Sequence, residues 1–263
     1  MNHTKFNIGH VLIKVDNLHE AVKDFENMGF QVTYGSKPKK STNAMIYFRD
    51  GSFLELFSTN FGQPINWIMK LIVKIMLIMK HPYAGRLRSY TINGEGFRDY
   101  ALDSANSNEF AGNMQWLTQV SVNVFGPRHM KRKNADGMSV SWSLQYPLDP
   151  RFPFFMSPYS PTMDVALKSV HSNGALCFDK LEIMTTKWEK DLLWYQSVFQ
   201  QKPEVERKGD QAFCCFSLND VRLVLIRGDK EGICQVILKS ENDRNGTKLE
   251  PKLCHGADLF LGK

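Results

Sequence analysis

The sequence lacks the features of a secreted or disulfide-stabilised chain. Its first ten residues, MNHTKFNIGH, contain no apolar stretch of the kind that a signal peptide carries. The cysteines are odd in number, and none forms a C-x-x-C pair. They are Cys177, Cys214, Cys215, Cys234 and Cys254. We therefore expect reduced thiols in a cytoplasmic protein, and neither a disulfide framework nor a zinc ribbon.

The sequence also lacks a concentration of charge. Its formal net charge is +6, but the lysines and arginines are scattered, apart from short runs such as MKRKN at 130–134. Such a spread is typical of a solvated surface, so we expect no specific nucleic-acid binding. A chain of 263 residues that is 43% hydrophobic and 23% charged has the composition of an ordinary globular protein with a sizeable core.

The longest apolar stretch, INWIMKLIVKIMLIMKHP at 65–82, is too short and too interrupted by lysine for a comfortable membrane span, which needs about 20 apolar residues. As a helix it would place Asn66, Lys70 and Lys74 on one narrow stripe. It could be buried between modules or in a homodimer, cover an apolar pocket as a lid, or lie on a membrane surface. We favour burial or dimerisation, with at least half of the apolar face of residues 65–80 buried in protein contacts, foremost across a homodimer, and we do not expect membrane association.

One order of elements recurs along the chain. Residues 8–15 predict a buried strand, and the next segment has apolar residues at the spacing of one helical face. Three further strands are predicted in FQVTYG, NAMIYF and SFLELF. The same order, β-α-β-β-β, recurs at 178–228 and more weakly at 97–157. In the weaker copy a helix is predicted near Asn106–Leu117, and RFPFFM is expected to be an edge strand at best because of Pro153 and Pro158.

A single unit of this kind leaves an apolar sheet face exposed and must pair with another. We expect a module at 1–60, an apolar helix and connection at 61–95 and a divergent module at 96–160. A third module is expected at 161–240, followed by a C-terminal tail at 241–263.

Glu55 stands out in the apolar run SFLELF. A buried carboxylate is costly unless a cation or a proton compensates it. Either Glu55 faces solvent from the rim of the sheet, or it meets a metal ion or takes part in proton chemistry.

Several segments together resemble the vicinal oxygen chelate superfamily, and within it the glyoxalase-like group. They are GHVLIKVDNLHEAVKDFENMGFQVT, NAMIYFRDGSFLELF, GEGFRDYALD, PRFPFFMSP and HSNGALCFDKLEI. The resemblance implies an α+β fold in which βαβββ modules form half-barrel sheets with helices outside. It also implies that His10 and Glu55 bind a divalent metal and that Asp99 contributes at the corresponding place in the middle module. Lys180 and Val224, the corresponding residues of the third module, cannot supply a metal site.

The remaining candidate residues concern a small-molecule ligand. Arg98 could hold an anionic substrate or form a structural ion pair, and His171 could line the site or belong to the turn at Asn173-Gly174. Trp142, Phe154 and Phe155 would line an apolar pocket. Two hypotheses follow. One is a metal-dependent enzyme of isomerase, lyase or dioxygenase type, with Glu55 as ligand and base. The other is a metal-free protein that sequesters a small molecule.

Overall fold

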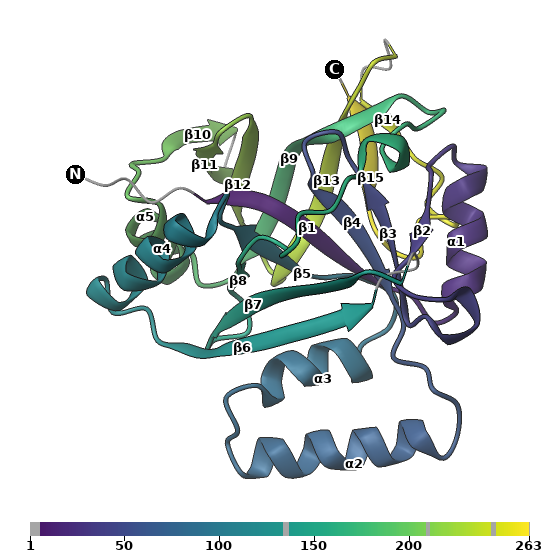
Figure 1. Cartoon of the computed structure of the whole chain (residues 1–263). Coiled ribbons are helices and arrows are strands. Elements are labelled where there is room, and N and C mark those ends of the chain that lie inside the picture. The colour runs from purple at the N-terminus through teal and green to yellow at the C-terminus, as the bar shows by residue number, and fades with distance from the viewer. Residues whose placement is uncertain (1–5, 134–136, 209–210, 243–245, 263) are drawn as a thin grey trace.

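The computed structural model describes residues 6–133, 137–208, 211–242 and 246–262, which form two curved sheets that pack against each other (Figure 1). The first sheet has eight strands in the order β2-β3-β4-β1-β5-β8-β7-β6. Its strands are β1 (Asn7–Lys14), β2 (Thr33–Tyr34), β3 (Asn43–Tyr47), β4 (Phe53–Phe57), β5 (Gly96–Asp103), β6 (Val124–Lys133), β7 (Ser139–Pro147) and β8 (Phe154–Met156). The first two modules therefore share one sheet, joined by the antiparallel pair β1–β5.

The second sheet has seven strands in the order β10-β11-β12-β9-β13-β15-β14. They are β9 (Ala175–Thr185), β10 (Glu204–Lys208), β11 (Gln211–Leu218), β12 (Val221–Arg227), β13 (Gly232–Ser240), β14 (Thr247–Lys248) and β15 (Leu259–Gly262). The segment expected as a tail, 241–263, thus includes two strands of this sheet. The second sheet repeats the arrangement of the first, because β9 and β12 pair in parallel as β1 and β4 do.

Five α-helices and two short 3-10 turns are seen in the described residues. The helices are α1 (Leu18–Asn27), α2 (Ile65–Ile78), α3 (Ala84–Ile92), α4 (Ser107–Gln119) and α5 (Trp188–Phe199), and the turns are Pro38–Lys40 and Ala166–Lys168. Asn17 caps α1 by accepting hydrogen bonds from the backbone N–H groups of His19 and Glu20. Asn106 caps α4 in the same way, which confirms the helix predicted at that place.

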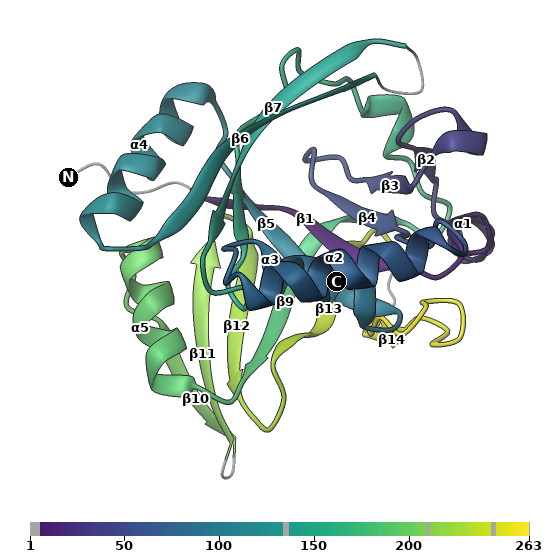
Figure 2. The ribbon, with the colours of Figure 1, turned by 90° about the horizontal axis from the view of Figure 1, so that it is seen from below.

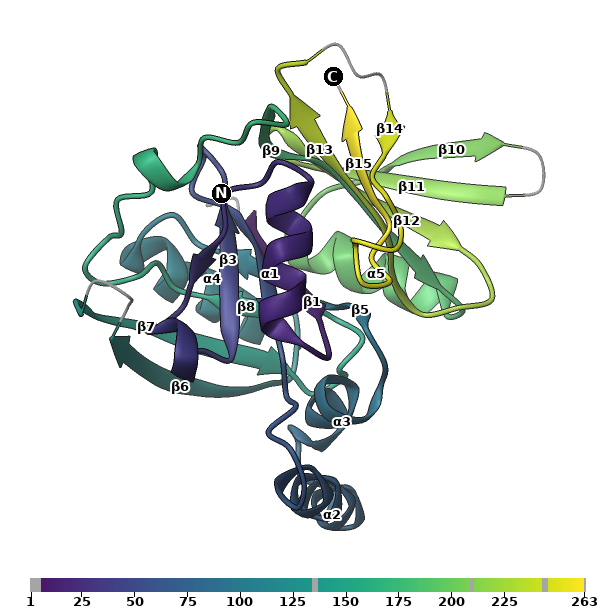
Figure 3. The ribbon, with the colours of Figure 1, turned by 90° about the vertical axis from the view of Figure 1, so that its right-hand side faces the viewer.

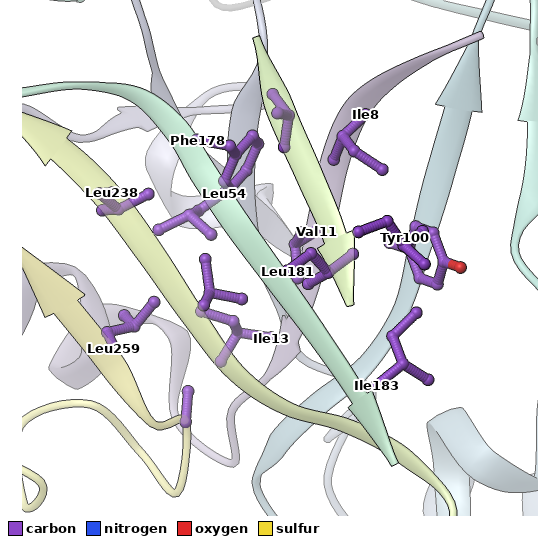
Figure 4. Close-up of a cluster of buried hydrophobic side chains, with 14 of the residues drawn as sticks. Ile8, Val11, Ile13, Leu54, Tyr100, Phe178, Leu181, Ile183, Leu238 and Leu259 are labelled. Atoms are coloured by element: carbon purple, nitrogen blue, oxygen red, sulfur yellow. The ribbon is translucent and has the colours of Figure 1, made fainter. Parts of the chain in front are cut away.

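The core lies between the two sheets and is built by strand alternation (Figure 4). Val11 and Ile13 of β1 face Leu181 and Leu238 of the second sheet, whereas His10 and Leu12 lie on the opposite face of β1. The first sheet therefore packs its convex face into the core and keeps its concave face for other contacts. Figure 3 shows the two sheets side on.

The segment RFPFFM is not an edge strand, which corrects the sequence-based expectation. Within it, β8 lies in the sheet between β5 and β7. The strand is only three residues long, and Pro153 and Pro158 fall outside it. The missing N–H groups of the two prolines therefore do not interrupt the hydrogen-bond ladder.

Helix α2 stands away from both sheets and lies beside α3 (Figures 1 and 3). Val73 is its one buried residue. Burial of half of the apolar face in a homodimer stays a prediction. No helix in the described parts of the chain has the length and apolar character needed to cross a membrane.

Candidate functional site in the concave face

The floor of the concave face is made by β1 and β4, which pair in parallel. The register places His10 beside Phe53 and Leu12 beside Glu55. Leu54 and Leu56 point into the core, so Glu55 must point into the concave face. Its side chain is 20% exposed. The carboxylate is therefore held inside the hollow of the half-barrel.

His10 and Glu55 converge on this floor. His10 Nε2 lies 3.8 Å from Glu55 Oε2. The imidazole stacks on Phe53 at 4.4 Å between ring centroids and meets the edge of Phe154 at 5.3 Å. Burial, assisted by the positive charge of Arg132, lowers the pKa of His10 to about 3, so the ring is neutral at physiological pH. Its Nδ1 is buried and has no hydrogen-bond partner among the described residues.

The environment of Glu55 favours a proton-accepting carboxylate. Burial raises its pKa, while the amide of Asn43 and the charge of Arg132 oppose that rise. Asn43 Nδ2 donates a hydrogen bond to Glu55 Oε1 at 2.7 Å. One carboxylate oxygen is thus fixed, and Oε2 faces His10.

Arg132 is a site residue that the sequence interpretation missed, because it lies in the run MKRKN taken as solvated surface. The hairpin β6–β7 curls over the concave face (Figure 2). On β6, Arg132 is half-buried between exposed Lys131 and Lys133, and Arg132 Cζ lies 5.5 Å from the centroid of the Trp142 ring. Its Nε is buried without a hydrogen-bond partner in the described part of the chain. Residues 128–131 are all exposed, so no alternation in this stretch distinguishes Arg132 from its neighbours.

Tyr159 was also missed. Its ring contacts Trp142 at 5.1 Å between centroids. Burial raises the pKa of its hydroxyl, and the carboxyls of Glu55 and Asp103 act in the same direction. Tyr159 packs against both the cluster that contains Phe154 and the cluster that contains Phe53.

A cavity of about 380 Å³ adjoins the pair but is not lined by His10 or Glu55 themselves. Phe53, which stacks on His10, lines this cavity, and Tyr159, Tyr47, Met156 and Asp103 contribute to its wall. Burial raises the pKa of Asp103 to about 8, and its Oδ1 has no hydrogen-bond partner among the described residues. The hollow thus combines an aromatic wall with groups able to exchange protons.

Asp99, expected as a third metal ligand, has other partners. Its carboxylate binds the guanidinium of Arg86 and accepts a hydrogen bond from the hydroxyl of Tyr90, both on α3. Arg86 also donates to the carbonyl of Phe152 at 2.7 Å. Asp99 and Glu55 pair with Leu12 from opposite sides, so their backbones are two strand spacings apart, roughly 10 Å.

The other candidates divide into two groups. Phe154 and Trp142 face the concave side, as the pocket hypothesis requires. Phe155 points into the core, and Arg98 donates to the backbone carbonyls of Glu95 and Phe97. His171 accepts from the N–H of Gln31 and donates to the carbonyl of Tyr47, both at 2.9 Å, so its two ring nitrogens are already engaged.

The described residues do not fit a resident divalent ion of the usual kind. Imidazole and carboxylate are suitable donors, but a catalytic ion generally has three protein ligands. No group of three or more His, Cys, Asp or Glu side chains that could hold a metal is found among them. A metal-bound histidine also normally donates its second N–H to an acceptor, and Nδ1 of His10 faces none.

Comparisons with solved structures show what this arrangement is similar to. A hypothetical protein from Staphylococcus aureus has 16% identity and a TM-score of 0.70, over 98% of both chains. The Mn(II)-bound glyoxalase from Novosphingobium aromaticivorans has 9% identity and a TM-score of 0.55, over 98% of this chain and 82% of that one. BphC, a halotolerant catechol dioxygenase, has 8% identity and a TM-score of 0.59, over 99% and 88%. At these identities the likeness shows the fold.

A search of curated proteins finds no match for the chain. The model of the Glyoxalase-like domain family matches residues 8–199, most of the length. The matched segment contains all of the first sheet except Asn7, including His10, Glu55 and Arg132. The half-barrel sheets expected from the sequence are confirmed, and the chain belongs to the Glyoxalase-like domain family.

Proposed function

We propose that the chain is an enzyme of isomerase or lyase type that acts on a small aromatic molecule with an anionic oxygen, bound in the concave face of the first sheet. The observation that carries the proposal is the buried Glu55 carboxylate, with Asn43 on one oxygen and neutral His10 at 3.8 Å from the other. Arg132 supplies positive charge on the opposite wall. Phe53, Phe154 and Trp142 provide the aromatic surface.

These groups suit proton transfer next to a carbonyl. Glu55 takes a proton from the carbon beside the carbonyl, and the electron pair of the broken C–H bond moves to the carbonyl oxygen. Arg132 stabilises the enolate oxygen that forms, in surroundings where burial strengthens the interaction. Because His10 stays neutral, it forms no ion pair with Glu55, and the carboxylate is free to accept the proton of the substrate. Return of the proton to the same or another carbon completes the step without a co-reactant.

Phenylpyruvate tests this proposal because it joins an aromatic ring, a carboxylate and an enolisable ketone. We expect the protein to accelerate exchange of its methylene protons in D₂O, followed by NMR. Glu55→Gln keeps an acceptor for Asn43 but removes the base, and should reduce the accelerated rate by about 10²-fold. Arg132→Gln removes the charge that stabilises the enolate and should also lower the accelerated rate. Binding without accelerated exchange would instead favour the second hypothesis, a protein that sequesters its ligand.

The alternative to be tested is a divalent ion held by His10 and Glu55. The observation in its favour is the convergence of His10 Nε2 and Glu55 Oε2. An ion that binds only the folded state raises the melting temperature. Because two protein ligands are too few, we expect Mn²⁺ or Zn²⁺ to leave the melting curve unchanged. A rise that both His10→Ala and Glu55→Gln abolish, and that fades at acidic pH, would establish the metal site and overturn this expectation.

A further inference from the structure

Helix α2 exposes more large apolar side chains than any function of the concave face requires. Trp67 is 61% exposed, Ile78 73% and Met79, at its C-cap, 75%. The other exposed apolar residues of this helix are Ile65, Ile68, Leu71, Ile72, Ile75 and Leu77. Figures 1 and 3 show why they stay exposed: α3 lies between α2 and the sheets.

The apolar surface covers more than half of the circumference of α2. Successive residues turn by about 100°, which places Asn66, Lys70 and Lys74 on one stripe near buried Val73. The exposed apolar residues occupy most of the remaining circumference. Trp67 precedes Lys74 by seven residues, so an indole and an ammonium group mark the same edge of the apolar surface. This surface is wider than the narrow seam along which two helices pair in a coiled coil.

The charge around α2 has one sign. Between Glu55 and Glu95 the sequence contains no aspartate or glutamate. Lys70, Lys74 and Lys80 are exposed on or just after α2, as is Arg88 on α3. If two copies of the chain met through this helix, these like charges would be brought together, and no acidic residue of α2 or α3 would offset them. The surface is complementary to a partner that is apolar inside and negatively charged at its edge.

We propose that α2 lies in the interface of an anionic lipid bilayer, parallel to its plane, with the apolar surface among the acyl chains and the lysines at the headgroups. An aromatic residue at the boundary and lysines beside it are the arrangement that interfacial helices use. The proposal replaces our expectation of a homodimer through this helix. It concerns attachment to a surface, and it does not depend on the chemistry proposed for the concave face.

Vesicle sedimentation with the full chain tests the proposal. We expect the protein to pellet with vesicles of phosphatidylcholine and phosphatidylglycerol, to pellet far less with phosphatidylcholine alone, and to be released by salt. Ile75→Asn combined with Ile78→Asn should lower the partition coefficient by about 10²-fold. Lys70→Gln combined with Lys74→Gln should lower it by roughly tenfold to thirtyfold on the anionic vesicles.

Leu167→Asn combined with Leu193→Asn is the matched control, since these residues are 86% and 63% exposed elsewhere on the surface. This variant should pellet like the parent protein. The substituted side chains are exposed, so circular dichroism should be unchanged in every variant. Failure of the parent protein to pellet with anionic vesicles would overturn the proposal. So would a dimer in light scattering that the Ile75 and Ile78 substitutions dissociate, since α2 would then be covered by a second copy.

Discussion

Replacing Arg86 with methionine is expected to lower the free energy of unfolding by about 3–5 kcal/mol, as removal of one partner from a buried ion pair does. The Arg86 side chain is 2% exposed and that of Asp99 4%. Without the guanidinium, the carboxylate of Asp99 keeps only the hydroxyl of Tyr90 and a backbone N–H as partners. Urea denaturation of the parent and the variant at neutral pH measures the difference.

Two further variants control this result. Changing Asp99 to leucine in the Arg86→Met background removes the unpaired charge and should restore most of the lost stability. Lys248→Met breaks the exposed pair with Asp258 and should change stability by only about 0–1 kcal/mol. If Arg86→Met alone has as small an effect as Lys248→Met, the pair does not hold α3 on the concave face.

Stability should fall as the pH rises from about 4 to about 8, because Asp103 keeps its proton in the folded state. Its folded pKa is about 8, whereas in an unfolded chain the carboxyl has its ordinary value of 3.8. Between these values the folded state binds more protons than the unfolded state, so each increase in pH favours unfolding. The side chain is partly open to the cavity, and we expect a total loss of about 2–5 kcal/mol.

Asp103→Asn removes the titration and should flatten this part of the pH profile. The variant should be more stable than the parent protein at pH 8 and close to it at pH 4, as measured by urea midpoints. Asp258→Asn, on the exposed surface, is the control and should leave the slope unchanged. An unaltered slope in Asp103→Asn would show that the carboxyl is already ionised at neutral pH.

The sequence allowed the floor of the site to be predicted because it depends on local pattern. Alternation in β1 and β4 and the resemblance of GHVLIKV and SFLELF to family segments placed His10 and Glu55 in one sheet. The parallel pairing of β1 and β4 then brought the two side chains together. Such inferences need only the period of a strand and the order of the elements.

The walls of the site could not be predicted in this way, because they depend on contacts between distant segments. Arg132 enters the site through the curl of β6–β7, which no local pattern fixes. Asp99 forms an ion pair with Arg86 because α3 folds back onto β5. His171 hydrogen-bonds to the carbonyl of Tyr47, which is 124 residues away in the sequence. The resemblance to the family placed the candidate residues on strands, but it could not show which side chains from other elements would contact them.

The two-sided role of β1 and β4 limits where the site can adapt to a new substrate. Every residue of the floor has a neighbour on the same strand that is locked in the core between the sheets, as His10 has Val11 and Glu55 has Leu54. A shift of the floor would disturb that packing, so divergence in substrate choice is confined to segments that leave the core alone. The hairpin β6–β7 and the segment around Tyr159 are such places. New specificities should accumulate there, while the floor is inherited nearly intact.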